Sequence, residues 1–257
     1  MKRLTAVVAV ILFLAGAAFA QKAKSNAELE ALKKVQAATT PADQIKAIDD
    51  VLANFADTQF KPVLLAMAAD AANRMHDYEK TIIYGERAIE ADPKNPDALY
   101  TVAGAIVLHT REHDLDRDEK LKKAEKLSND GIAAAKVIPN PQPGQISDAL
   151  WEQEKKDKVA AFYNLLAMSA DLKKDYPGAI ENFKTAIGLL TKPDPVIFAR
   201  LSKTYNNAGQ PDDAIAAADK VLADSSATPV VKRAATVEKD RAAKLKAEPA
   251  AAPAAPK

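Results

Sequence analysis

Three segments of the chain share one spacing of small residues, and this spacing is the strongest constraint on the fold. In each segment a small side chain stands twelve residues before a second one. The pairs are Ala69 and Thr81, Ala167 and Ala179, and Ser202 and Ala214. Two antiparallel helices approach closely only where small side chains meet at their crossing. The spacing therefore predicts a series of helix pairs built to one plan.

The rest of the chain also has the apolar periodicity of helices, and no window alternates as a strand does. Ile45, Ile48 and Val51 form one such apolar stripe. Several helices are expected to start with a capping residue followed by proline, as at Thr40–Pro41 and Asn95–Pro96. The predicted helices span about 25–38, 41–55, 61–75, 78–91, 96–110, 117–137, 147–174, 177–190, 195–208, 211–223 and 229–246.

The helix pairs resemble those of the tetratricopeptide repeat (TPR) family, whose 34-residue repeat is a helix–turn–helix. One unit matches the family's L-G/A…A-x3-F-x2-A pattern with Leu166, Ala167, Ala179, Phe183 and Ala186. An earlier unit matches its second half with Thr81, Gly85, Ala88 and Pro93. The third unit keeps Ser202, Tyr205 and Ala214, but Ala218 stands where the family has a large residue.

This resemblance implies an all-α fold, a right-handed α-α superhelix of the TPR-like solenoid type. It would contain about three to five helix pairs and a C-terminal capping helix, within residues 21–247. The expected units lie at about 62–95, 96–139, 160–193 and 195–228. The second is irregular because its candidate crossing residues, Ala103 and Ala124, stand 21 residues apart rather than twelve.

The two ends of the sequence have a different character. Lys2 and Arg3 precede an uncharged run that ends in small residues at Ala18 and Ala20, the pattern of a secretory signal peptide at 1–20. We therefore expect export, most simply to a bacterial periplasm. An uncleaved N-terminal membrane anchor is the alternative, because the run is 17 residues long. The Ala/Pro-rich segment 248–257 is expected to be a disordered tail.

Composition excludes several classes of function. The absence of Cys excludes disulfides, thiol catalysis and Cys-ligated metals. A net charge of +1 gives no electrostatic case for nucleic acid. No G-x-S-x-G motif is present, and no Ser or Thr stands beside a plausible base. We expect no catalytic residue, no cofactor and no enzymatic activity.

One pair of histidines gives the chain a possible metal site. His109 and His113 are four residues apart, which on a helix would place both imidazoles on one face. A catalytic zinc site needs a third protein ligand and a base, and the segment lacks the H-E-x-x-H arrangement. We therefore predict exposed histidines and no metal, and keep a metal-binding protein as the less favoured alternative.

In TPR proteins the inner faces of the first helices line a groove that receives peptides or partner helices, and the resemblance implies such a surface here. Projecting the repeat pattern gives Asp70, Asn73, Arg74, Tyr100, Asn164, Met168, Asp171, Arg200, Lys203, Asn206 and Asn207. Amides can bond a peptide backbone, and cations can bond carboxylates. The predicted function is an exported scaffold for a protein or peptide partner in assembly of a cell-envelope complex. The alternative is a structural solenoid that associates with itself.

Overall fold

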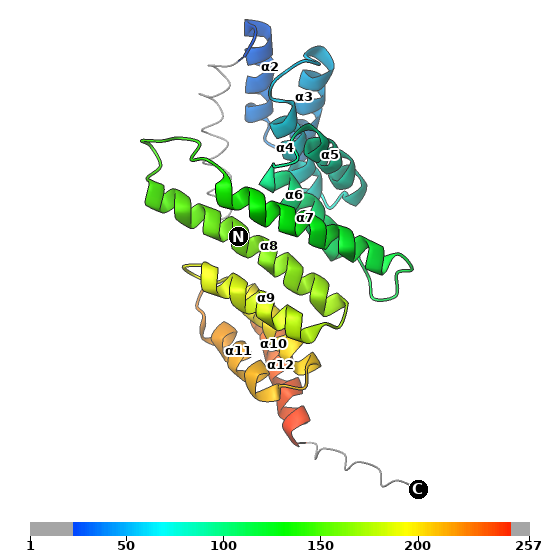
Figure 1. Ribbon diagram of the computed structural model, residues 1–257, viewed down its shortest axis with the longest axis vertical. Helices are drawn as coiled ribbons and strands as arrows, with labels where there is room; N and C mark the ends of the chain where they lie inside the picture. The colour runs from blue at the N-terminus through cyan, green and yellow to red at the C-terminus, as the bar shows by residue number, and fades with distance from the viewer. Residues whose placement is uncertain (1–22, 248–257) are drawn as a thin grey trace. The chain divides into compact units, whose positions relative to one another are not determined.

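The structure is a computed structural model and describes residues 23–247 (Figure 1). The predicted signal peptide and the predicted tail lie outside the described residues. Within them the chain forms eleven helices and no β-strand, so the all-α prediction is confirmed. The helices are α2 (Asn26–Ala37), α3 (Pro41–Asn54), α4 (Lys61–Arg74), α5 (Tyr78–Ala91), α6 (Pro96–His109), α7 (Arg117–Val137), α8 (Asp148–Leu172), α9 (Tyr176–Leu189), α10 (Pro195–Asn207), α11 (Pro211–Ala223) and α12 (Pro229–Ala247).

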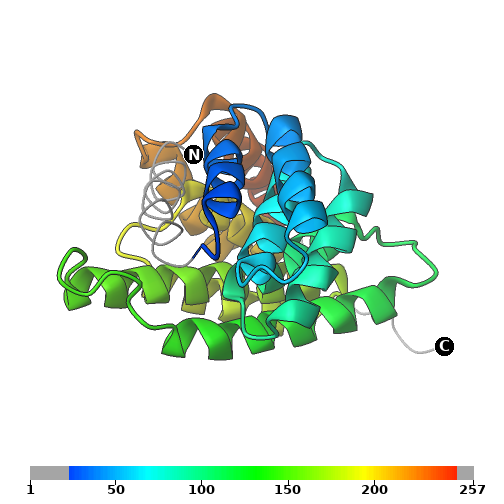
Figure 2. The same ribbon diagram turned by 90° about the horizontal axis from the view of Figure 1, so that it is seen from above.

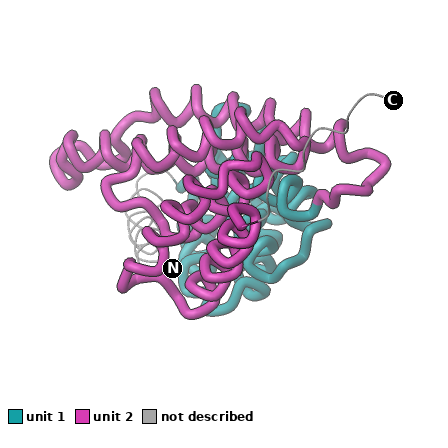
Figure 3. The backbone as a smooth tube through the Cα atoms, turned by 90° about the horizontal axis from the view of Figure 1, so that it is seen from below, with its two compact units in different colours: residues 1–109 teal, residues 110–257 magenta. Residues whose placement is uncertain are grey.

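The chain divides into two compact units, residues 1–109 and residues 110–257 (Figure 3). The described part of unit 1 contains α2 to α6, and that of unit 2 contains α7 to α12. The segment 96–139, expected to be one irregular repeat, is shared between them, because α6 ends unit 1 and α7 begins unit 2. No helix in 23–247 is long and apolar enough to cross a membrane.

In unit 1 the apolar stripes of consecutive helices meet in a continuous core. Leu32 of α2, Ile48 of α3 and Leu64 of α4 are all fully buried in one cluster. The helix pair α4–α5 buries Ala69 and Thr81, the residues expected at its crossing. Stacking these helices removes their apolar faces from water, which an isolated pair cannot do.

Unit 2 repeats the arrangement with two longer helices at its start. Figure 2 shows α7 and α8, the long green helices, lying beside each other. Where they pack, the ring of Phe162 covers Gly131, and a Cβ at Gly131 would lie 2.1 Å from the Phe162 Cζ atom. The pair α8–α9 fully buries Ala167 and Ala179, and α10–α11 fully buries Ser202 and Ala214. The small residues with the predicted spacing are thus buried in all three helix pairs.

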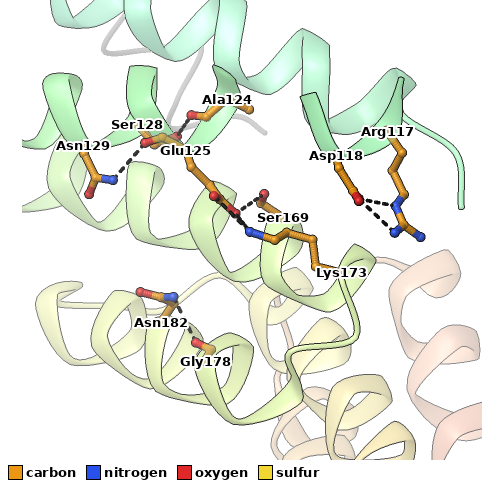
Figure 4. A network of polar contacts seen from close by, with 10 residues as sticks. All are labelled: Arg117, Asp118, Ala124, Glu125, Ser128, Asn129, Ser169, Lys173, Gly178 and Asn182. Carbon is orange, nitrogen blue, oxygen red and sulfur yellow. Dashed lines mark hydrogen bonds and ion pairs between the residues drawn. The ribbon is translucent and has the colours of Figure 1, made fainter. Parts of the chain in front are cut away.

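An ion-pair network also joins α7 to α8 (Figure 4). The carboxylate of Glu125 on α7 accepts a 2.9 Å hydrogen bond from the Ser169 hydroxyl on α8. The ammonium of Lys173, the residue directly after α8, lies 2.9 Å from the same oxygen. These contacts fix the C-terminal half of α8 against α7.

Side chains near the start of α8 bind the ends of its two neighbours. The indole Nε1 of Trp151 donates a 3.1 Å hydrogen bond to the carbonyl oxygen of Ile138, just after α7. The Gln153 amide donates a 3.4 Å hydrogen bond to the carbonyl oxygen of Leu189, at the end of α9. The last carbonyls of a helix have no hydrogen-bond partner within that helix. Side chains of α8 therefore provide partners for carbonyl oxygens at the ends of α7 and α9.

The turns inside three helix pairs have the same backbone geometry. Each contains one residue with a positive φ angle, of 59°, 63° and 70°, at His76, Lys174 and Gly209. The residue that follows donates its N–H to a carbonyl five residues earlier, at 3.0, 2.9 and 2.9 Å. This is the Schellman termination of a helix, for which glycine is the favoured residue. Local geometry therefore repeats where sequence identity does not.

Candidate partner-binding surface

The predicted groove residues fall in both units, so they form two surfaces that are described separately. Four are in unit 1, on α4 and α6: Asp70, Asn73, Arg74 and Tyr100. Seven are in unit 2, on α8 and α10: Asn164, Met168, Asp171, Arg200, Lys203, Asn206 and Asn207. All of them lie on helices that come first in the repeat pattern.

On the surface of unit 1, the cation of Arg74 is bound by the protein itself. Its Nε atom lies 3.0 Å from a carboxylate oxygen of Asp70, and its Nη2 atom donates a 2.6 Å hydrogen bond to the Gln44 side chain on α3. Burial raises the pKa of Asp70, Arg74 opposes this shift, and the nearby carboxylate of Asp97 adds to it. Arg74 thus stabilises Asp70 and joins α4 to α3, while Asn73 and Tyr100 are exposed.

On the surface of unit 2, side chains of α8 and α10 are hydrogen-bonded directly to one another. The guanidinium of Arg200 donates a 3.1 Å hydrogen bond to the side-chain oxygen of Asn164. The hydroxyl of Thr204 donates a 3.0 Å hydrogen bond to a carboxylate oxygen of Asp171. The ammonium of Lys203 lies 4.0 Å from the other oxygen of that carboxylate. Four of the predicted residues therefore meet in two pairs between these helices, Arg200 with Asn164 and Lys203 with Asp171.

The bonded row continues onto α12. The side-chain amide of Asn206 donates hydrogen bonds of 2.8 and 2.9 Å to the backbone carbonyl and the carboxylate of Glu238. The guanidinium of Arg241 lies 3.5 Å from the same carboxylate. Sequence reasoning missed Thr204, Glu238 and Arg241. The spacing of four between Arg200 and Thr204 was the available signal, whereas α12 was expected only as a cap.

Burial separates the members of this row into two groups. Asn164 and Asn206 are 9% and 4% exposed, so their amides connect helices and are not available to a partner. Lys203 keeps 57% of its side chain exposed. Met168 and Asn207 are partly exposed. On α8 and α10, the groups that solvent and a partner can reach therefore include Lys203, Met168 and Asn207. Arg241 of α12 is exposed as well.

The two histidines of the metal-binding alternative do not lie on one helix. The helix α6 ends at His109, and His113 lies in the loop that precedes α7, so the two imidazoles do not share a helix face. The His109 ring lies against Tyr78, with ring centroids 4.4 Å apart, and its Nδ1 atom is 3.0 Å from the carbonyl oxygen of Ala105. Among residues 23–247, no group of three or more His, Asp or Glu side chains is arranged to hold a metal ion.

Comparison with solved structures identifies the fold. A thermophilic TPR protein of Thermus thermophilus superposes with a TM-score of 0.56 and 15% sequence identity, over 77% of this chain and 90% of that one. A double mutant of MamA gives a TM-score of 0.47 at 14% identity, over 86% and 92% of the chains. A TPR protein of Parabacteroides merdae gives 0.38 at 15% identity, over 82% and 88%.

The fold is therefore TPR-like, as the first of these structures shows, and the resemblance inferred from the repeat spacing is confirmed at the level of fold. A scan of protein-family models finds no match, and neither does a search of curated proteins. This agrees with how far the repeats depart from the family pattern, for example at Ala218.

Proposed function

We propose that this chain is a non-enzymatic scaffold that binds a protein or peptide segment in unit 2. The segment would lie along α8 and α10, which come first in their helix pairs. The observation that supports this is the row of bonded polar side chains contributed by α8, α10 and α12. Such a row holds the exposed Lys203 and its neighbours on a rigid base. A rigid base reduces the entropy lost when a partner binds.

The exposed groups suit a peptide more than a small molecule. The amide of Asn207 can bond a peptide backbone, and the thioether of Met168 gives adaptable apolar contact. The ammonium of Lys203 lies 4.0 Å from the carboxylate of Asp171, beyond hydrogen-bonding distance, so it can turn toward a carboxylate of the partner.

The cellular setting is part of the same proposal. The leader-like segment 1–20 supports export to the periplasm, and with it a role in assembling a cell-envelope complex. The test is the mass of the chain recovered from the producing bacterium. A chain that begins at Gln21 and is released by osmotic shock supports export, and an intact chain in the cytoplasm contradicts it.

The binding proposal is tested by affinity capture from an envelope fraction with three forms of the chain. The variant Lys203→Glu reverses the most exposed cation of the row. The control Lys126→Glu makes the same charge change on α7, at a side chain that is 76% exposed and pairs with Asp130 of its own helix. Arg200 is left unchanged because it connects α10 to α8.

The expected result is a captured protein that wild type and Lys126→Glu retain and that Lys203→Glu loses at least tenfold, with equal melting temperatures for all three forms. Equal capture by all three would place the binding surface elsewhere. Loss in both variants would show a general charge effect and would also contradict the proposal.

A further inference from the structure

One face of α8 carries a regular stripe that α10 covers only in part. The stripe alternates steps of four and three residues, which places all its members on one side of the helix. Its members are Leu150, Glu154, Asp157, Ala161, Asn164, Met168 and Asp171. The contacts of Asn164 and Asp171 with α10 show which way this stripe faces.

The first part of the stripe extends beyond α10. The bond between Arg200 and Asn164 sets the register. Arg200 is the sixth residue of α10, whereas Asn164 is the seventeenth residue of α8. About eleven residues at the start of α8 therefore have no α10 beside them. Leu150, in this part, is 54% exposed. Glu154, Asp157 and Ala161 are partly exposed. These four residues, Leu150, Glu154, Asp157 and Ala161, are the part of the stripe that α10 leaves uncovered and are called the uncovered acidic stripe.

The two carboxylates of this stripe are poorly compensated. Burial raises the pKa of Glu154, the carboxylate of Asp157 adds to the shift, and Lys158 offsets only part of it. Burial also raises the pKa of Asp157. A 2.7 Å hydrogen bond from the Gln153 amide lowers this pKa, but by less than burial raises it. Cationic side chains placed beside this stripe by another molecule would therefore stabilise both carboxylates in their ionised form.

The last helix carries a second uncovered stripe with the same spacing and the opposite charge. Its members are Val230, Ala234, Val237, Arg241 and Lys244, and all five are exposed. The two valines are 74% and 58% exposed. Arg233, beside the stripe, adds another exposed cation, and Asp240 is the one exposed acid of α12. This set of five is the uncovered basic stripe.

The two stripes match residue by residue. Leu150, Glu154 and Asp157 are separated by four and then three residues, and Val237, Arg241 and Lys244 follow the same order. An apolar residue and two charges thus stand at equal intervals on both helices. Stripes with this alternation are the surfaces through which helices pack side by side.

We propose that the uncovered basic stripe of one copy of this chain packs on the uncovered acidic stripe of another, so that the protein associates head to tail. Packing two acidic stripes or two basic stripes together would place like charges side by side. The interface therefore joins two different surfaces, the acidic stripe of one copy and the basic stripe of the other. Each bound copy keeps one free stripe of each kind. Such an interface forms a ring where the rotation closes and an open chain where it does not.

The first experiment is sedimentation velocity on the full chain from low micromolar to near-millimolar concentration, at low and at high salt. The average mass is expected to rise with concentration at low salt and to fall back as salt screens the charges. A chain that stays monomeric over the whole range at low salt overturns the proposal.

Charge reversal identifies the two surfaces. The double variants Glu154→Lys/Asp157→Lys and Arg241→Glu/Lys244→Glu are each expected to weaken association at least tenfold. A mixture of the two variants is expected to associate again, because each then meets a complementary stripe. Recovery in the mixture cannot come from a merely misfolded variant.

The matched control reverses two acids on other helices, Glu181→Lys on α9 and Asp213→Lys on α11, both exposed. It changes the net charge as much as the acidic-stripe variant and is expected to associate like wild type. If the control loses association equally, or if the mixture does not recover it while both variants keep wild-type circular dichroism and melting, the assignment of these stripes is overturned.

Discussion

The hydroxyl of Ser202 on α10 donates a 2.8 Å hydrogen bond to the backbone carbonyl of Ala214 on α11. The two residues are twelve apart and fully buried, and the equivalent residues of another repeat, Ala167 and Ala179, are fully buried as well. A small residue at this position serves two purposes here. It lets the helices approach, and it adds a bond between them.

Enlarging this crossing residue should therefore destabilise the fold. Ser202→Leu inserts a larger side chain into a site with no space, and overpacking of this kind costs about 1–3 kcal/mol. Thermal or urea unfolding measures the loss. The control Thr236→Leu, at an exposed position of α12, is expected to change stability by less than about 0.5 kcal/mol.

Two glycines in helices should respond in opposite ways to the same change. In Gly131→Ala the new Cβ would meet the ring of Phe162, so we expect a loss of about 1–3 kcal/mol. In Gly188→Ala the Cβ enters open space, and removing a flexible glycine from α9 should add about 0.5–1 kcal/mol. Urea denaturation compares the two, and a loss of similar size in both would contradict the close-packing explanation.

The turn with positive φ gives another pair of opposite effects. His76→Gly should raise stability by several tenths of a kcal/mol up to about 1, because glycine adopts this conformation without steric cost. Gly209→Ala, at the equivalent position of a later pair, should lower stability by about 1 kcal/mol. Calorimetry of both variants beside wild type tests whether the two turns are equivalent.

One helix lacks a cap that its equivalents have. The carboxylate of Asp77 accepts the N–H of Lys80, and that of Asp175 accepts the N–H of Gly178. Gln210 stands at the same place before α11 and forms no such bond. Gln210→Asp should therefore stabilise the chain by about 0.5–1 kcal/mol. Asp175→Ala should cost about 1 kcal/mol, and no change in both would show that capping contributes little here.

The carboxyl group of Asp157 should make the stability of the fold depend on pH. Burial raises its pKa in the folded chain, so the ionised form destabilises the fold above that pKa, and the penalty disappears as the pH falls below the unfolded value. Asp157→Asn should raise the melting temperature at pH 7, and the gain should vanish near pH 3. An equal gain at both pH values would trace the effect to something other than charge. Asp213→Asn, at an exposed residue, is the control.

Sequence patterns were sufficient to predict the fold because the fold depends on local signals. Helix starts follow from caps and prolines, such as Thr40 with Pro41, and the helix pairs follow from the twelve-residue spacing. All eleven predicted helices are present within a few residues of their expected ends. The repeated turns were harder to predict. His76, Lys174 and Gly209 all have a positive φ angle, but only glycine is a residue type that indicates this conformation in a sequence.

The candidate surface could be predicted only in outline. Repeat phase assigned Asn164 and Asn206 to the first helices of two pairs, but their burial depends on contacts between helices far apart in sequence, such as that with Glu238. The metal hypothesis was wrong in its premise, because the helix that was to hold both histidines ends at His109. Where a helix ends decides which side chains share a face, and spacing alone does not.

Trp151 is the only tryptophan of the chain, and its indole is buried and bonded beside the end of α7. Its fluorescence is therefore a reporter for unit 2 alone, while circular dichroism sums the helices of both units. If the two signals follow the same denaturation curve, the two units unfold as one cooperative body. If the curves separate, one half of this chain can lose its structure while the other remains folded.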